Sequence, residues 1–152
     1  MPIKFISLNE LFVDKVQQLG YDGNVMKIED YLPTRKTYYV SPVNSLCFMD
    51  SGIDLALSRI VFPGIERKVK AAMCKLNIKN VLGRNYLPIG SSIIIDHTES
   101  VSLVVAPTML LPQSVPHTNN AYYATMAVLY NIMIHREEDI ENADILFTSL
   151  CC

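Results

Sequence analysis

The chain has 152 residues, half of them hydrophobic, which suits one domain with a sizeable core. A formal net charge of −2 and a pI near 5.9 offer no basic surface to nucleic acid, so nucleic-acid binding is disfavoured. No apolar run approaches the roughly 20 residues of a membrane span, and the first residues lack the apolar stretch of a signal peptide. We therefore expect an intracellular protein, cytoplasmic or otherwise, with no membrane partner.

Strand and helix patterns alternate along the first half of the chain. Short β-branched and apolar runs predict strands over residues 3–8, 25–28 and 37–40. Apolar residues at helical spacing predict helices over residues 10–19, 53–60 and 65–76. Asn9 is a suitable N-cap for the first of these helices, and Gly20 is suited to end it.

The second half of the chain begins with a pair of strands. Residues 92–96 and 102–106 predict two strands joined by a polar turn, and three prolines then mark an irregular stretch. Asn119 or Asn120 caps an expected helix that ends near His135, and residues 144–150 predict a last strand. We expect one domain over residues 1–152, a three-layer α/β/α fold with a mixed central sheet.

The four cysteines indicate neither a disulfide framework nor a metal site. Cys151 and Cys152 are adjacent, and no pair has the CxxC spacing of a zinc site, so we expect no metal and no cofactor. Cys47 lies in a polar loop, but no histidine is near it in sequence to activate a thiol. Small hydrophobic cysteines in a reducing compartment are the simpler interpretation.

The segment from residue 40 to residue 54 carries the strongest functional signal. It follows a β-branched run and precedes a helical pattern, so it joins the carboxyl end of a strand to a helix start. In an open α/β sheet, ligands bind in the crevice beyond the strand ends. A loop of Asp50, Ser51 and Gly52 lets backbone N–H groups approach an anion at the helix start. The segment therefore predicts a pocket for a phosphate-bearing nucleotide.

Three motifs follow one another around this segment. They are an acidic turn at Glu29-Asp30-Tyr31, a strand end at Val40-Ser-Pro-Val-Asn44, and a loop at Met49-Asp-Ser-Gly-Ile-Asp54. Their order, continued by residues 87–90, the paired strands, the following helix and residues 144–149, resembles a macrodomain, the ADP-ribose-binding module. The resemblance implies the three-layer fold, and ADP-ribose or an ADP-ribosylated substrate as partner. It also implies a second glycine-rich loop beyond Cys152.

The resemblance implies a role for each polar residue of these motifs. Asp30 would accept a hydrogen bond from the adenine amino group, with Tyr31 beside it, because a carboxylate only accepts. Asn44 would contact the distal ribose hydroxyls, and Asp54 falls where catalytic members place an aspartate that orients or activates a water. Without the resemblance, the simpler roles are a solvated turn for Asp30, an Asx-type turn for Asn44 and a helix-start aspartate for Asp54.

The loop keeps part of the family pattern and departs from it elsewhere. The backbone N–H groups of Ser51, Gly52 and Ile53 would face the diphosphate or the distal ribose, and Gly52 would allow close approach. Ser41 replaces the first asparagine of the strand-end motif with a smaller polar anchor. Asp50 replaces a glycine and would repel a nearby phosphate by about 3 kcal/mol, so we expect either that it points away or that the ligand is not a diphosphate in the usual pose.

Three functions fit these residues. The chain would hydrolyse an ADP-ribosyl bond, on a modified protein or on ADP-ribose 1″-phosphate, with Asn44 and Asp54 as catalytic residues. Alternatively it would read ADP-ribose without turnover, or use a macro-like fold with a degenerate pocket for assembly or nucleic-acid contact. The Asn44 and Asp54 pair favours hydrolysis, whereas the replacements at Ser41, Asp50 and Ser51 favour the other two functions. We rank ADP-ribose binding first, and the oligomeric state stays open.

Overall fold

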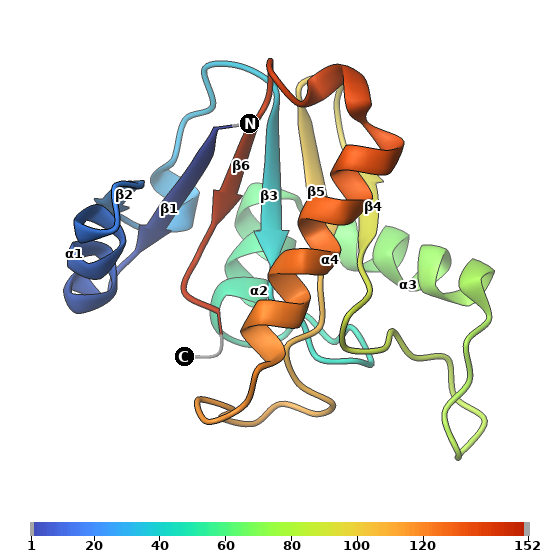
Figure 1. Cartoon of the computed structure of the whole chain (residues 1–152). Coiled ribbons are helices and arrows are strands. Elements are labelled where there is room, and N and C mark those ends of the chain that lie inside the picture. Colours follow the sequence, from blue (N-terminus) through green and yellow to red (C-terminus); the bar gives the residue numbers. More distant parts are fainter. Residues whose placement is uncertain (1, 151–152) are drawn as a thin grey trace.

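A six-stranded sheet forms the middle layer of the fold (Figure 1). The structure is a computed structural model that describes residues 2–150. The strands are β1 (Ile3–Ser7), β2 (Asp22–Val25), β3 (Thr37–Ser41), β4 (Ile93–Asp96), β5 (Val101–Val105) and β6 (Asp144–Phe147). Their order is β2-β1-β6-β3-β5-β4, and all neighbours are parallel except β4, which runs antiparallel to β5. The predicted α/β class with a mixed sheet is confirmed.

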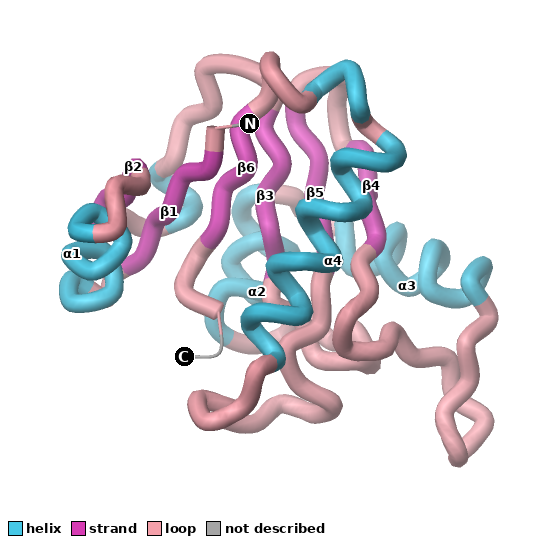
Figure 2. Tube along the Cα trace, in the orientation of Figure 1, coloured by secondary structure: helices cyan, strands magenta, loops and turns pink. Residues whose placement is uncertain are grey.

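Helices cover both faces of this sheet, as Figures 1 and 2 show. One face carries α1 (Glu10–Gln18) and α4 (Asn120–His135). The other face carries the 3-10 turn η1 (Ile28–Asp30), α2 (Gly52–Ala56) and α3 (Ile65–Leu76). The expected three-layer architecture follows from this arrangement. No helix within residues 2–150 has the length and apolar character needed to cross a membrane.

The central strand β3 shows how the two apolar layers arise. All five of its residues are buried, because helices cover both faces of the sheet around it. Successive side chains point to opposite faces. Tyr38 and Val40 pack in the cluster that holds Val128 of α4, whereas Tyr39 packs in the cluster that holds Val69 of α3. The tyrosines of β3 are therefore core residues on both faces.

The predicted helices at residues 10–19, 65–76 and 120–135 are confirmed to within about a residue. Asn9 caps α1 through its side-chain oxygen, which accepts a hydrogen bond from the Phe12 N–H at 3.1 Å. Gly20 follows the helix with a φ of +86°, the left-handed conformation that suits glycine. The helix expected at residues 53–60 begins one residue earlier as α2, and continues as a π-helical turn, η2 (Leu57–Val61).

The strand predicted at residues 25–28 is wrong. The strand β2 lies earlier, and Ile28 begins the turn η1 instead. Gly23 of β2 lies directly against α1, where a Cβ atom would come within 3.1 Å of Val16 Cγ1. The close approach of α1 therefore requires a residue without a side chain at this position of β2. The side chain of Ile28 is buried in the core of the opposite face. The last strand also ends early, at Phe147 instead of residue 150.

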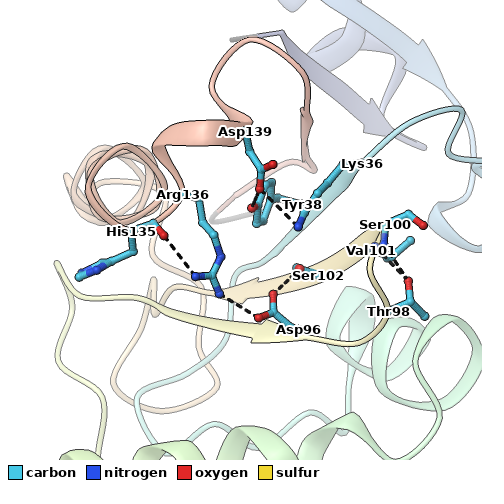
Figure 3. A network of polar contacts seen from close by, with 10 residues as sticks. All are labelled: Lys36, Tyr38, Asp96, Thr98, Ser100, Val101, Ser102, His135, Arg136 and Asp139. Atoms are coloured by element: carbon cyan, nitrogen blue, oxygen red, sulfur yellow. Dashed lines mark hydrogen bonds and ion pairs between the residues drawn. The ribbon is translucent and has the colours of Figure 1, made fainter.

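A polar network holds the segment after α4 to the start of β3 and the end of β4, at one end of the sheet (Figure 3). The Tyr38 hydroxyl donates to Asp139 in the turn η3 (Glu137–Asp139), and Lys36 Nζ pairs with the same carboxylate at 3.3 Å. Arg136 reaches Asp96 of β4 at 2.9 Å. Burial, and then the bond to Asp139, raises the pKa of Tyr38, so its hydroxyl stays protonated and donates. This network lies at the end of the sheet opposite the segment after β3.

The Tyr38→Phe variant tests the contribution of this network to stability. Removing a buried hydroxyl that donates to a carboxylate is expected to lower the free energy of unfolding by about 1.5 kcal/mol. Lys36 still pairs with Asp139 in the variant, which limits the loss. Urea unfolding of the two proteins measures the difference. Tyr122→Phe, at a residue whose side chain is exposed, is the matched control and should change stability by less than about 0.5 kcal/mol.

Candidate functional site

Two adjoining hollows lie at the carboxyl ends of β1, β3 and β6. The first, here called the η1 hollow, has a volume of about 330 Å³ and is lined by residues of β1, η1 and α2, with Thr148 after β6. The second, here called the Asp54 hollow, has a volume of about 300 Å³ and is lined by the segment after β3, the start of α2 and the proline-rich stretch. Gly52 and Ile53 line both hollows, which therefore adjoin at the start of α2 and are together called the crevice; each has a volume at the lower end of the range for small-molecule sites.

The start of α2 lies where the two hollows adjoin. Gly52 has a φ of +56°, in the left-handed region that glycine adopts without strain. The first N–H groups of a helix, here those of Gly52, Ile53 and Asp54, have no acceptor within the helix. Ser51 precedes them, but its side chain makes no capping hydrogen bond. The residues that carry these N–H groups line the hollows, and that the groups face a ligand stays a prediction.

Asp54 is held against the end of β3. Ser41 Oγ, fully buried, donates a hydrogen bond to Asp54 Oδ1 at 2.6 Å. Burial raises the pKa of Asp54 to about 7, against the opposing effect of the Ser41 hydrogen bond, and the charges of Asp50 and Glu66 raise it further. A carboxyl group with this pKa exchanges its proton readily at neutral pH, which is the property a general base needs. Ser41 thus acts on Asp54 and is absent from the lining of the crevice.

Asn44 lines the Asp54 hollow, but most of the hydrogen-bonding groups of its side-chain amide are bonded to its own loop. Its side-chain oxygen accepts the Leu46 N–H at 3.0 Å, and its Nδ2 donates to the Phe48 carbonyl at 2.9 Å. The side chain is almost fully buried. The Asx-type turn, one of the two roles open from the sequence, is therefore present. A second N–H of Nδ2 is what remains for a ligand.

The acidic turn is placed differently from what the resemblance implies. Asp30 is exposed and lines neither hollow, and its neighbour Glu29 lines the η1 hollow instead. Tyr31 packs edge to face on Tyr39, with ring centroids 6.0 Å apart, and also lines neither hollow. The structure therefore does not bring Asp30 and Tyr31 to the crevice. Asp50 is exposed and outside the lining as well, as expected for a residue that points away.

Sequence reasoning predicted only Gly52 and Ile53 of the η1 hollow, and Glu29 and Thr148 are among the residues that it missed. Thr148 is 1% exposed, and its hydroxyl oxygen has no hydrogen-bond partner within residues 2–150. A buried hydroxyl without a partner beside a hollow is an unsatisfied polar group, which buried polar groups of folded proteins seldom are. The signal in the sequence that could have found Thr148 is its place towards the carboxyl end of the last predicted strand, since ligands of open α/β sheets bind beyond strand ends.

The cysteines of the described residues do not provide a reactive thiol at the crevice. Cys47 is buried, and burial raises the pKa of its thiol to about 12. Cys74 is exposed and lies on α3, away from both hollows. Among residues 2–150 no group of three His, Cys, Asp or Glu side chains is arranged to hold a metal ion. Cys151 and Cys152, and the loop expected after them, lie outside the described residues.

The fold and the crevice define a class, a three-layer α/β domain with a ligand-sized crevice at its strand ends. The sequence matches no model of a known protein family. None of the curated proteins matches it either.

Proposed function

We propose that the crevice binds ADP-ribose or an ADP-ribosyl derivative. The observation that carries the proposal is the arrangement of two hollows around the free backbone N–H groups of Gly52 and Ile53. In this arrangement the adenine lies in the η1 hollow, the diphosphate lies over the start of α2, and the distal ribose lies in the Asp54 hollow. The resemblance of the strand-end and loop motifs to a macrodomain supports the placement of the diphosphate and the distal ribose, whereas the acidic turn does not support that of the adenine.

The η1 hollow suits a nucleobase. Its walls are mostly apolar and come from Ile6, Met26, Ile28 and other residues of the core, which favours a flat aromatic ring. Glu29 lines the hollow, and its carboxylate would be an acceptor for an exocyclic amino group. The unpartnered hydroxyl of Thr148 both donates and accepts. These polar groups would orient the base while the apolar walls supply most of the contact.

The start of α2 suits the diphosphate. Backbone N–H groups at a helix start bind anions through hydrogen bonds and through the positive end of the helix dipole. Gly52 lets the phosphate approach the backbone, since a Cβ at this position would meet no protein atom within 4 Å and would occupy open space. Lys27, in the lining of the η1 hollow, adds one positive charge on the same side.

Hydrolysis of the ADP-ribosyl bond is the activity that Asp54 favours over binding alone. Its carboxylate would accept a proton from a water whose oxygen attacks C1″ of the distal ribose. The substituent at C1″ would leave with the electrons of the broken bond and take up a proton. The Ser41 hydrogen bond would hold the carboxylate in place for this step. A binding module without turnover remains the second candidate, because Asn44 uses most of its amide in the loop.

Calorimetric titration with ADP-ribose and AMP tests the binding proposal. ADP-ribose is expected to bind with a micromolar Kd, and AMP at least tenfold more weakly, because AMP leaves the Asp54 hollow unfilled. A tenfold difference corresponds to about 1.4 kcal/mol. Failure of ADP-ribose to bind would overturn the proposal. Equal binding of AMP would restrict the site to the η1 hollow and remove the case for hydrolysis.

Two variants test whether the carboxylate of Glu29 or that of Asp30 contacts the adenine. Because Glu29 lines the η1 hollow and Asp30 does not, Glu29→Gln is expected to weaken ADP-ribose binding about fivefold, a loss of about 1 kcal/mol. Asp30→Asn removes a charge from the next residue and is expected to change the Kd by less than about twofold, about 0.4 kcal/mol. Titration of both variants measures the difference. The reverse order would restore the role that the resemblance implies for Asp30.

A further inference from the structure

The Asp54 hollow is an anionic end of the crevice. Of the ten residues that line it, only Asp54 carries an ionisable side chain, and none is a lysine, arginine or histidine. Two further carboxylates, Asp50 and Glu66, lie near enough for their charges to act on Asp54 in addition to the larger effect of burial. A ligand group that enters this hollow therefore meets negative charge.

Lys70, which pairs with one of these acids, is already engaged. Lys70 Nζ pairs with Glu66 Oε1 at 3.1 Å and lies 4.7 Å from the centroid of the Phe48 ring. It lines neither hollow. Ser41 donates to Asp54 Oδ1, which leaves the other carboxylate oxygen for a ligand. Within residues 2–150 no cation of the protein offsets Asp54 inside the hollow.

We propose that this hollow selects ADP-ribosyl ligands whose C1″ substituent is a guanidinium group, and rejects those whose C1″ substituent is a phosphate. The inference rests on the proposed function, which places the distal ribose in the Asp54 hollow. A guanidinium that carries a sugar on one nitrogen keeps its positive charge, and its planar N–H donors match a carboxylate. A phosphate at the same carbon brings between one and two negative charges to the same carboxylate. Like charges in one hollow repel each other, and no lysine or arginine lines the hollow to compensate.

The selection is expected to depend on pH. Since burial raises the pKa of Asp54 to about 7, its carboxylate fraction increases between pH 6 and pH 8. The ionisable groups that act on it are Asp50 and Glu66, and it in turn acts on Cys47. Burial raises the pKa of the Cys47 thiol to about 12, so that thiol stays neutral in this range. The preference for the cation should therefore increase with pH.

The test is calorimetric titration of the whole chain with three ligands, ADP-ribose, ADP-ribosyl-agmatine and ADP-ribose 1″-phosphate, at pH 6 and pH 8. At pH 8 the agmatine derivative is expected to bind at least tenfold more tightly than the phosphate derivative. In Asp54→Asn the two should differ by less than threefold. Glu99→Gln, which removes the same charge from an exposed turn, is the matched control and should keep the preference of the unmodified chain.

Each outcome separates the inference from the function on which it rests. If ADP-ribose itself does not bind, the proposed function fails and the inference fails with it. If ADP-ribose binds but the phosphate derivative binds as tightly as the agmatine derivative, the inference alone is wrong. This comparison uses the unmodified chain, so it holds even if Asp54→Asn does not fold. A preference for the cation that Asp54→Asn retains would also overturn the inference, because it would come from another group.

Discussion

Replacing Asp54 with asparagine is expected to raise the free energy of unfolding by about 2–3 kcal/mol at pH 8 and by about 1 kcal/mol at pH 5. In the folded chain burial raises the pKa of Asp54 from 3.8 to about 7. At a pH between these two pKa values, the Asp54 carboxyl is protonated in the folded state and ionised in the unfolded state. The free energy of unfolding therefore falls as pH rises through this window and levels off above about pH 7. These changes in the free energy of unfolding include a reduction for the partial exposure of the Asp54 side chain.

Urea unfolding at several pH values checks this prediction. The unmodified chain should lose stability relative to Asp54→Asn as pH rises from 5 to 8, and the Ser41 hydroxyl can still donate to the amide oxygen. Asp14→Asn, on the exposed side of α1, is the control for removal of a surface charge and should follow the unmodified chain. If the difference between Asp54→Asn and the unmodified chain does not change with pH, the carboxyl is ionised normally in the fold. It would then be unsuited to the proton transfer we propose.

The Gly52→Ala variant is expected to weaken ADP-ribose binding at least thirtyfold, about 2 kcal/mol. Gly52 has a φ of +56°, which an alanine adopts only at a cost of about 1–2 kcal/mol, so the start of α2 would shift to relieve it. The added Cβ would also occupy open space where both hollows adjoin. The backbone donors and the room for the diphosphate would therefore be lost together. Titration with ADP-ribose measures the effect.

Gly83→Ala is the matched control for this variant. Gly83 has a φ of +73°, and a Cβ there would also meet no atom within 4 Å, so the backbone strain is similar. It lies in the loop after α3 and lines neither hollow. Both variants should lose similar stability in urea unfolding, but Gly83→Ala should bind ADP-ribose as the unmodified chain does. If the two variants bind equally well, the start of α2 is not where the diphosphate lies.

The local elements of this fold could be predicted from the sequence because their causes are local. The helix α3 has its apolar residues Ile65, Val69 and Met73 at helical spacing, so one face can be buried whatever the neighbours are. Asn9 and Gly20 mark the ends of α1 through capping and a left-handed conformation, which depend only on the adjacent backbone. The position of the crevice follows for the same reason, since the loop after β3 has to pass the strand ends.

Which residues line the crevice was decided by tertiary structure. Whether Glu29 or Asp30 faces the η1 hollow depends on a single turn, η1, whose direction is set by the burial of Ile28 under the sheet. Thr148 joins the wall because β6 lies between β1 and β3, an order that no local pattern encodes. The likeness of the acidic turn to a family motif therefore did not establish which of its side chains lines the hollow.

Asp54 shows most clearly which properties the sequence determined and which the tertiary structure determined. The sequence by itself determined that a carboxylate follows the glycine loop at a helix start, and that Ser41 ends the preceding strand. Only the tertiary structure brought the Ser41 hydroxyl to 2.6 Å from that carboxylate and buried the pair, with Asp50 and Glu66 nearby. A pKa depends on the solvent and charges around a group, and these come from distant segments that pack together. Residue identity is local, whereas the proton affinity that gives this residue its proposed role is a property of the whole fold.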